Sequence, residues 1–152
     1  SGIGQGDVLR TPLQLNTVTA AVANGGKRVR PRLVSTSEES LRATSEVTGT
    51  GSSEGGVSQE TLSLIRQGMR KSMTDGSNRF ANSSVVAIAG KTGTAETHSG
   101  NPHSWFTAFA PYDDPQIAVT VIVEHGGCLG AYHPSVRVAK EILEYYFTNP
   151  RE

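Results

Sequence analysis

The sequence predicts an α+β fold in which an antiparallel sheet of about three strands is packed with helices. Two observations lead to this prediction. Three separate stretches carry helix-capping residues and helical spacing of apolar side chains, and short β-branched segments joined by turn residues lie between the second stretch and the third. Consecutive short strands with tight links pair antiparallel. The 152 residues are enough for one modest core.

The first helix is predicted over residues 12–24. Thr11 is a favourable N-cap, Pro12 suits the first helical position, and Gln14 stands three residues after the cap. Gly25-Gly26 ends the segment. Its apolar side is expected to consist of Leu15, Val18 and Val22.

Two further helices are expected. One runs over residues 59–73, with Ser58 as its cap and Asp75-Gly76 as its stop. Its predicted apolar face contains Leu62, Ile65, Met69 and Met73. The other begins near Pro134 and is expected to pack on the sheet through Val138, Ile142, Leu143 and Tyr146 to Phe147.

The strands are predicted from apolar, β-branched segments. They are residues 85–89 leading into Lys91, residues 104–110, residues 117–123 and a short strand at 32–34. The turn-like residues 98–102 and 111–115 separate the later three. The aromatic side chains expected in the core are Trp105, Phe106 and Phe109.

The chain is expected to be one partial domain over residues 1–152, interrupted by a flexible loop or linker at residues 35–56. That segment is rich in serine, threonine, glycine and glutamate and has few apolar anchors. We find no internal repeat.

The amino-acid composition limits which kinds of binding partner can be expected. Fourteen basic and fourteen acidic residues give a formal net charge of zero, which gives no reason to expect nucleic acid or an anionic membrane surface as a partner. No stretch approaches the roughly 20 apolar residues that span a bilayer. A lone cysteine, Cys128, excludes an internal disulfide. Cys128 and the nearby His125 and His133 lack the regular spacing and the fourth ligand of a zinc site, so no metal is predicted.

The segment from Gly90 to Glu96 places a cation, two hydroxyls and an unhindered backbone together after an apolar strand. A phosphate-binding loop is excluded, because Val85 stands where its first glycine should be and a strand rather than a helix follows. Alternation along a strand puts Lys91 and Gly93 on one face and Thr92 and Thr94 on the other.

This set of groups suits a peptide that ends in a carboxylate. Threonine hydroxyls can donate to a carboxylate, an ammonium supplies the matching charge, and a backbone N–H can point at a developing oxyanion. Gly93 has no Cβ, so an extended ligand could pair with this strand. His98 and His103 flank the following loop and could touch such a ligand.

Lys91-Thr92-Gly93-Thr94 resembles the third signature motif of the penicillin-recognising serine acyl-transferases, whose other signatures are S-x-x-K and S-x-N. The flanks resemble the transpeptidase domain of class B penicillin-binding proteins, and the last of them is closest to the elongation-type branch. They occur in the family's order as Gly4-Gln5-Gly6, Thr11 to Leu15, Ala23 to Gly26, Arg30-Pro31, Gly90 to Glu96, Trp105 to Pro111 and Val123 to Gly127.

The resemblance implies a peptidoglycan D,D-transpeptidase that cross-links stem peptides, is acylated by β-lactam antibiotics and needs no cofactor. It implies catalytic roles for Lys91, near the substrate carboxylate and the nucleophile, and for the backbone N–H of Thr94 as an oxyanion donor. It implies substrate binding by Thr92, Gly93 and Thr94. The expected location is the extracytoplasmic face of the bacterial membrane, with the anchor in a segment outside these residues.

The nucleophile motif is absent from this chain. Its four lysines are preceded three residues upstream by Asn24, Gly68, Ile88 and Arg137, never by serine. Ser99-Gly100-Asn101 follows Lys91 instead of preceding it and is interpreted as a turn. The chain is therefore expected to be the C-terminal half of the transpeptidase fold, inactive without the missing N-terminal half. The alternatives are a non-catalytic sensor of carboxylates or β-lactams, or a structural interaction module of the same fold.

Overall fold

The computed structural model describes residues 9–31, 56–76, 78–98, 100–127 and 133–149. Its elements are, in chain order, α1 (Pro12–Ala23), α3 (Gln59–Thr74), the 3₁₀ turn η2 (Arg79–Ala81), β1 (Ala89–Thr97), β2 (Gly100–Ala110), β3 (Ile117–Val123) and α4 (Pro134–Thr148). The three strands form one antiparallel sheet in the order β1-β2-β3. The predicted α+β class and the three-stranded sheet are therefore confirmed.

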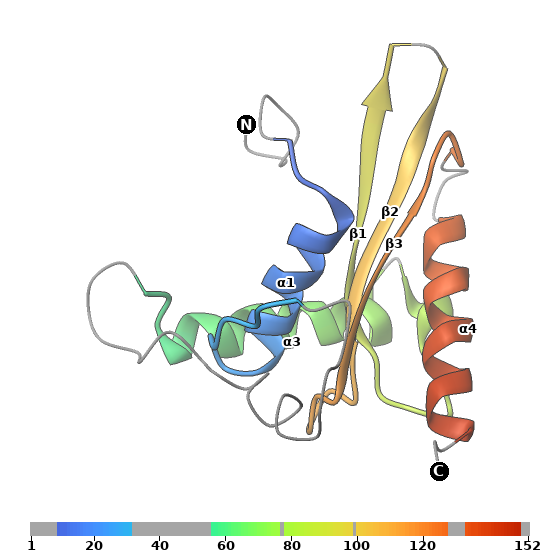
Figure 1. Cartoon of the computed structure of the whole chain (residues 1–152). Coiled ribbons are helices and arrows are strands. Elements are labelled where there is room, and N and C mark those ends of the chain that lie inside the picture. The colour runs from blue at the N-terminus through green and yellow to red at the C-terminus, as the bar shows by residue number, and fades with distance from the viewer. Residues whose placement is uncertain (1–8, 32–55, 77, 99, 128–132, 150–152) are drawn as a thin grey trace, which may run out of the picture.

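Helices cover both faces of the sheet. Figure 1 shows α1 on one side and α4 on the other, with α3 crossing near β1. Thr107 of β2 bonds to Thr19 of α1, whereas its neighbour Phe106 packs in one cluster with Val136 of α4. Because successive strand residues point to opposite faces, odd-numbered residues of β2 face α1 and even-numbered residues face α4.

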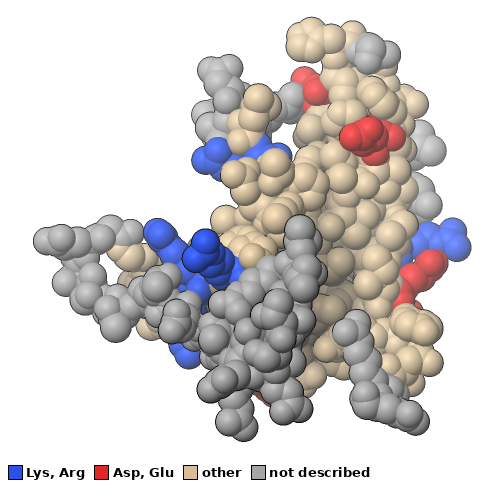
Figure 2. Space-filling view, viewed as in Figure 1, with Lys and Arg blue, Asp and Glu red and all other residues tan. Residues whose placement is uncertain are grey.

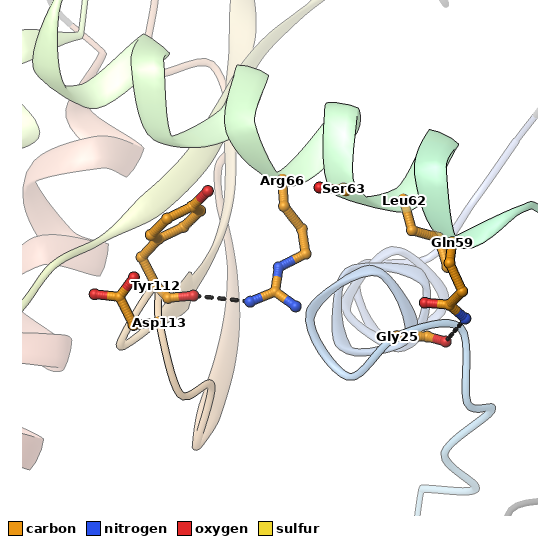
Figure 3. A pocket seen from close by; sticks show the side chains of 7 residues that line it. All are labelled: Gly25, Gln59, Leu62, Ser63, Arg66, Tyr112 and Asp113. Carbon is orange, nitrogen blue, oxygen red and sulfur yellow. Dashed lines mark hydrogen bonds between the residues drawn. The ribbon is translucent and has the colours of Figure 1, made fainter.

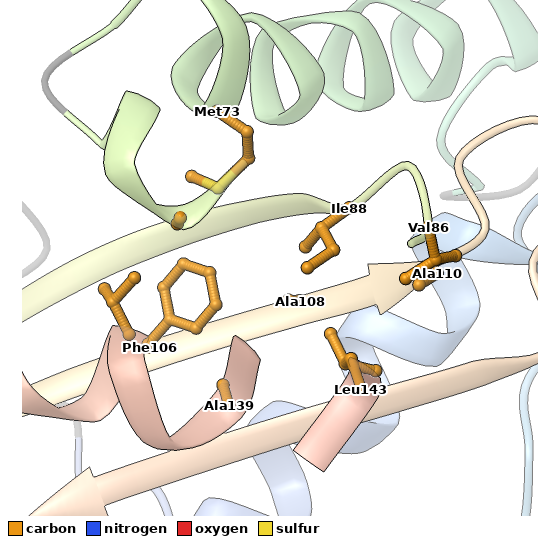
Figure 4. Close-up of a cluster of buried hydrophobic side chains, with 10 residues drawn as sticks. Met73, Val86, Ile88, Phe106, Ala108, Ala110, Ala139 and Leu143 are labelled. Atoms are coloured by element: carbon orange, nitrogen blue, oxygen red, sulfur yellow. The ribbon is translucent and has the colours of Figure 1, made fainter. Parts of the chain in front are cut away.

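The larger core cluster lies between the sheet and α4, and Figure 4 shows its side chains converging there. Phe106 and Leu143 are fully buried in it, and Met73 from the end of α3 joins them. On the opposite face Phe109 and Ala89 pack with Ala23 of α1. The predicted burial of Phe106 and Phe109 is confirmed, while Trp105 is only partly buried.

The helix boundaries agree closely with the prediction because the capping residues act as expected. Thr11 and Gln14 form a reciprocal capping box at the start of α1, and the Ser58 side chain accepts a hydrogen bond from the Thr61 N–H at the start of α3. Gly26, with a φ of 95°, follows α1 in the left-handed region that glycine tolerates.

The predicted helix faces need correction. Val18, Ile65, Val138 and Ile142 are all exposed, at 59, 41, 41 and 43 %. Leu62 and Met73 on α3 and Leu143 on α4 are buried as predicted, whereas the prediction missed the buried Thr19 and Ala23 on α1 and Val136 and Ala139 on α4. Small and polar residues such as Thr19 and Ala139 are buried against the sheet, and a pattern that counts only large apolar residues misses them.

Two strand predictions are also wrong in their limits. Residues 85 and 86 form a bend and residues 87 and 88 have no regular secondary structure, so β1 starts only at Ala89. Residues 100–102 belong to β2 instead of a turn. The Gly127 N–H donates to the Pro102 carbonyl, and the His125 ring bonds to the Asn101 carbonyl, so the loop after β3 holds this end of β2 extended. The predicted strand at 32–34 and the linker at 35–56 lie outside the described residues, apart from Gly56.

Candidate functional site

The four residues predicted to form the site all lie in β1. In the register, Lys91 is opposite Thr107, and Thr92 is opposite Phe106. Lys91 and Gly93 therefore share the face that α1 covers, and Thr92 and Thr94 share the face of α4. The register shifts between Ala95 and Thr97, beyond the motif, so the alternation across positions 91 to 94 is regular.

Backbone groups of β1 alternate between the paired side and the open side of the strand. The Ala87 carbonyl accepts from the Tyr112 N–H just beyond β2, whereas the Ile88 carbonyl accepts from the Arg70 side chain on α3. The Thr92 carbonyl accepts from Lys91 Nζ. Even-numbered residues thus direct their carbonyl and N–H groups away from β2, and the Thr94 N–H lies on that side. In the described part of the chain β1 pairs with β2 alone, so this side is a sheet edge.

Lys91 is exposed, and its Nζ donates to the Thr92 carbonyl at 2.7 Å. Its charge acts on His133, the residue that precedes α4. Partial burial is the larger cause that lowers the pKa of His133 below its usual value of 6.5, and the positive charge of Lys91 is the second cause. The cation of the motif therefore lies within electrostatic reach of the start of α4.

The Thr92 hydroxyl accepts a hydrogen bond from a residue that the sequence did not indicate. Asn78, which is 3 % exposed, donates from Nδ2 to Thr92 Oγ1 at 3.3 Å and to Ser72 Oγ on α3 at 3.0 Å. Sequence reasoning missed Asn78 because it lies 14 residues before Thr92, in a segment without a periodic pattern. No motif signal could have found it.

His103 of β2 and His125, which follows β3, lie together beside the hairpin end of β2. His103 Nδ1 accepts from the His125 backbone N–H at 2.9 Å, and the two rings meet edge to face with centroids 4.7 Å apart. His125 adopts a φ of 51°, which turns the chain after β3. His103 is opposite Ala95, next to the motif, whereas His98 is exposed at the hairpin end of β1. His103 and His125 therefore hold the loop after β3 against the start of β2.

Two described pockets lie elsewhere. One, of about 250 Å³, is lined by Gly25 just after α1, by Arg66 and other residues of α3, and by Tyr112 and Asp113. Figure 3 shows the Arg66 guanidinium donating to the Tyr112 carbonyl. The other, of about 380 Å³, lies between η2 and α4 and includes Phe80 and Lys140. Lys91 lines neither pocket. Within the described residues, the motif thus lies on a strand edge and outside both of these pockets.

The described surface over the sheet carries few charged side chains on the face drawn in Figure 2, and the described residues include no cluster of metal-binding side chains. On the face drawn in Figure 2, uncharged side chains cover most of the described surface over the sheet, and charged ones are scattered around it. Among the described residues, no three His, Cys, Asp or Glu side chains gather in a way that could hold a metal. Cys128 lies outside them. None of the helices in the described ranges is long and apolar enough to cross a bilayer.

The α+β layers, with Lys-Thr-Gly-Thr on an edge strand, define the class of protein: the penicillin-binding protein and serine β-lactamase-like transpeptidase fold. The family model described as "Penicillin binding protein transpeptidase domain" matches residues 1–144. The chain therefore belongs to the penicillin-binding protein transpeptidase family.

Relatives and solved structures agree with this membership. The chain is 41 % identical over 133 residues to the peptidoglycan D,D-transpeptidase PbpA of Mycolicibacterium smegmatis, across 84 % of this chain and 26 % of the relative. It is 30 % identical over 172 residues to MrdA of Haemophilus influenzae, across 95 % of this chain and 25 % of the relative. The chain spans about a quarter of the length of these curated relatives.

The structural matches extend over most of the chain. An imipenem acyl-enzyme complex of penicillin-binding protein A from M. tuberculosis matches with a TM-score of 0.69 and 32 % identity, covering 92 % of this chain and 32 % of that one. Pseudomonas aeruginosa PBP2 in complex with WCK 5153 matches with a TM-score of 0.72 and 31 % identity, covering 95 % and 31 %. The MrdA and PBP2 matches support the predicted elongation-type branch.

Proposed function

We propose that this chain supplies the substrate-binding edge strand of a peptidoglycan D,D-transpeptidase. The observation that supports the proposal is the outward direction of the even-numbered backbone groups of β1, on the side of the strand that pairs with no other strand in the described part of the chain and to which we assign the Thr94 N–H. A peptide or a β-lactam can align along such an edge and direct its reacting carbonyl oxygen to that N–H.

The residues of the motif then have separate roles in binding and catalysis. Lys91 provides positive charge toward the substrate carboxylate and the nucleophile. The hydroxyls of Thr92 and Thr94 donate to the carboxylate, and Gly93 lets the ligand approach the backbone. The attacking serine, with its S-x-x-K lysine, comes from a part of the protein outside these 152 residues.

Three further points belong to the proposal. The natural substrate is a peptidoglycan stem peptide, and β-lactams acylate the same serine. The reaction takes place on the extracytoplasmic face of the bacterial membrane. The 152 residues by themselves form no penicilloyl adduct, because the covalent route needs the missing hydroxyl and its partner domain half.

The test is labelling by a fluorescent penicillin. The full-length protein should be labelled, the 152-residue chain should not, and addition of the N-terminal half of the domain should restore labelling. In the full-length protein, Lys91→Ala should slow labelling by about 10²-fold or more, as loss of a charge-stabilising group at a reacting centre does. Lys27→Ala, an exposed lysine beyond the end of α1, is the matched control and should label normally.

Two outcomes would overturn the proposal. Rapid covalent labelling of the Lys91→Ala protein would show that the motif strand is not part of the acylation site. Reversible binding of a stem peptide by the full-length protein without any covalent adduct would instead favour a carboxylate-binding sensor.

A further inference from the structure

Asn78 is a buried polar side chain whose position is unusual for its place in the fold. It precedes η2 at the N-cap position, where an asparagine side chain ordinarily accepts a hydrogen bond from the helix backbone. Here the side chain makes no such bond. Its amide group instead donates to Ser72 Oγ at 3.0 Å and to Thr92 Oγ1 at 3.3 Å. The Asn78 side chain thus bonds to α3 and to the motif strand and does not cap η2.

The contact with Thr92 restricts what that hydroxyl can do. A threonine hydroxyl carries one proton and can accept two hydrogen bonds. Because Asn78 donates to Thr92 Oγ1, one of its accepting positions is filled, and the proton of the hydroxyl remains to be donated in another direction. Asn78 is 3 % exposed, whereas Thr92 is only partly buried, so the accessible directions lie on the side away from Asn78.

The support for Asn78 is itself fixed. Ser72 lies on α3, two residues after Arg70, whose guanidinium bonds to the Ile88 carbonyl at 2.8 Å just before β1. The same helix therefore holds β1 at two places, through Arg70 on the backbone and through Ser72 and Asn78 on the Thr92 side chain. This arrangement keeps the Asn78 amide in register with Thr92.

We propose that Asn78 is a positioning residue that orients the Thr92 hydroxyl so that its proton is donated to the carboxylate of a ligand on the β1 edge. The inference rests on the proposed function, in which Thr92 binds that carboxylate. Asn78 touches no ligand itself and acts through Thr92.

The test compares a penicillin that has a free carboxylate with its methyl ester, as the rate of acylation of the full-length protein. Asn78→Ala should slow acylation by the free acid by about three- to tenfold, the range of one lost hydrogen bond, and leave the ester almost unchanged. A residue that served stability alone would slow both ligands equally. Asn16→Ala, which removes the acceptor of a hydrogen bond from the Thr120 hydroxyl on the α1 side of the sheet, is the matched control and should not change the ratio of the two rates.

Asn78→Asp keeps the shape of the side chain and reverses its hydrogen-bonding role. The ionised carboxylate accepts the Thr92 proton and also repels the ligand, so acylation by the free acid at pH 7.5 should be slower than in Asn78→Ala. When the introduced carboxyl is protonated at lower pH it can donate again, so the ratio of variant rate to wild-type rate should rise as the pH falls. This variant also serves if Asn78→Ala does not fold.

Thr92→Val separates this inference from the proposed function. If Thr92→Val abolishes the preference for the free acid while both Asn78 variants retain it, the positioning role is wrong and the proposed function stands. If Thr92→Val retains the preference, the carboxylate-binding role of Thr92 is wrong and the inference falls with it. If all three variants lower the preference for the free acid and the Asn78→Asp ratio rises in acid, the positioning role is established.

Discussion

At the scale of single residues, the motif strand depends on a close approach at Gly90. A Cβ built at Gly90 would lie 2.4 Å from Cζ of Phe106 and 3.0 Å from the Thr107 carbonyl oxygen. Phe106 is fully buried and cannot move aside without disturbing the core between the sheet and α4. The glycine just before Lys91 is therefore a packing requirement.

Gly90→Ala should lower the free energy of unfolding by about 1–3 kcal/mol, the usual cost of overpacking a core. Chemical denaturation of the full-length protein measures it. Gly68→Ala is the matched control: no atom lies within 4 Å of its added Cβ, and it lies inside α3, so this change should stabilise by about 0.5–1 kcal/mol. Equal effects of the two changes would contradict the packing argument.

His133 offers a probe of the Lys91 charge. Its pKa is lowered by burial and, second, by Lys91, so Lys91→Ala should raise the pKa toward 6.5 without restoring it fully. Nuclear magnetic resonance titration of the labelled histidine measures this shift, and Lys27→Ala should leave the titration unchanged.

The sign of the pH dependence follows from the same shift. A lowered folded-state pKa means that the unfolded chain binds the extra proton first as the pH falls below about 6.5. The contribution of His133 to stability is therefore complete above pH 6.5 and declines as the pH falls through the folded-state pKa. His133→Gln should flatten that acid-side decline; a steeper decline would contradict the assignment.

At the scale of elements, the start of α1 is fixed by a reciprocal pair. The Gln14 N–H donates to Thr11 Oγ1 at 3.2 Å, and the Thr11 N–H donates to Gln14 Oε1 at 3.0 Å. Helix α1 carries Thr19, which bonds to Thr107 directly opposite Lys91, so the cap also stabilises the layer beneath the motif.

Thr11→Ala should lower the free energy of unfolding by about 1 kcal/mol, as loss of an N-cap does. A double-mutant cycle with Gln14→Ala, read by denaturation, should give less than additive losses because the two bonds support each other. Fully additive losses would mean that the two residues act independently.

The sequence predicted those elements that depend on interactions between residues close in the chain. It did not predict strand limits or burial that depend on contacts between distant segments. The caps at Thr11 and Ser58 involve residues three positions apart, and both helix starts were predicted correctly. The strand state of residues 100–102 depends on the loop at 125–127, and the burial of Thr19 depends on Thr107, 88 residues away. For the site, the motif strand was predicted from its own residues, while Asn78 required the fold that brings η2 beside it.

At the scale of the whole molecule, the described sheet has two open edges. Within the described residues, β1 and β3 each pair on one side alone. The outer face of α4 adds an apolar stripe, with Val138, Ile142 and Tyr145 exposed at 41, 43 and 70 %. Unpaired strand edges and contiguous apolar side chains both favour association with another polypeptide.

The isolated 152-residue chain should therefore associate as its concentration rises, and the N-terminal half of the domain should suppress this association. Sedimentation velocity over a hundredfold concentration range measures it. A chain that stays monomeric throughout that range would show that these edges and the α4 stripe need no covering.

The pairing irregularity between Ala95 and Thr97 separates the hairpin tip from the motif. Lys91 and Thr107 are aligned by ladder bonds on the core side of that shift, so extra residues added beyond it change the loop and leave the alignment alone. A short epitope or a dye inserted near the exposed His98 would therefore detect ligand binding at β1 without disturbing the alignment of the motif.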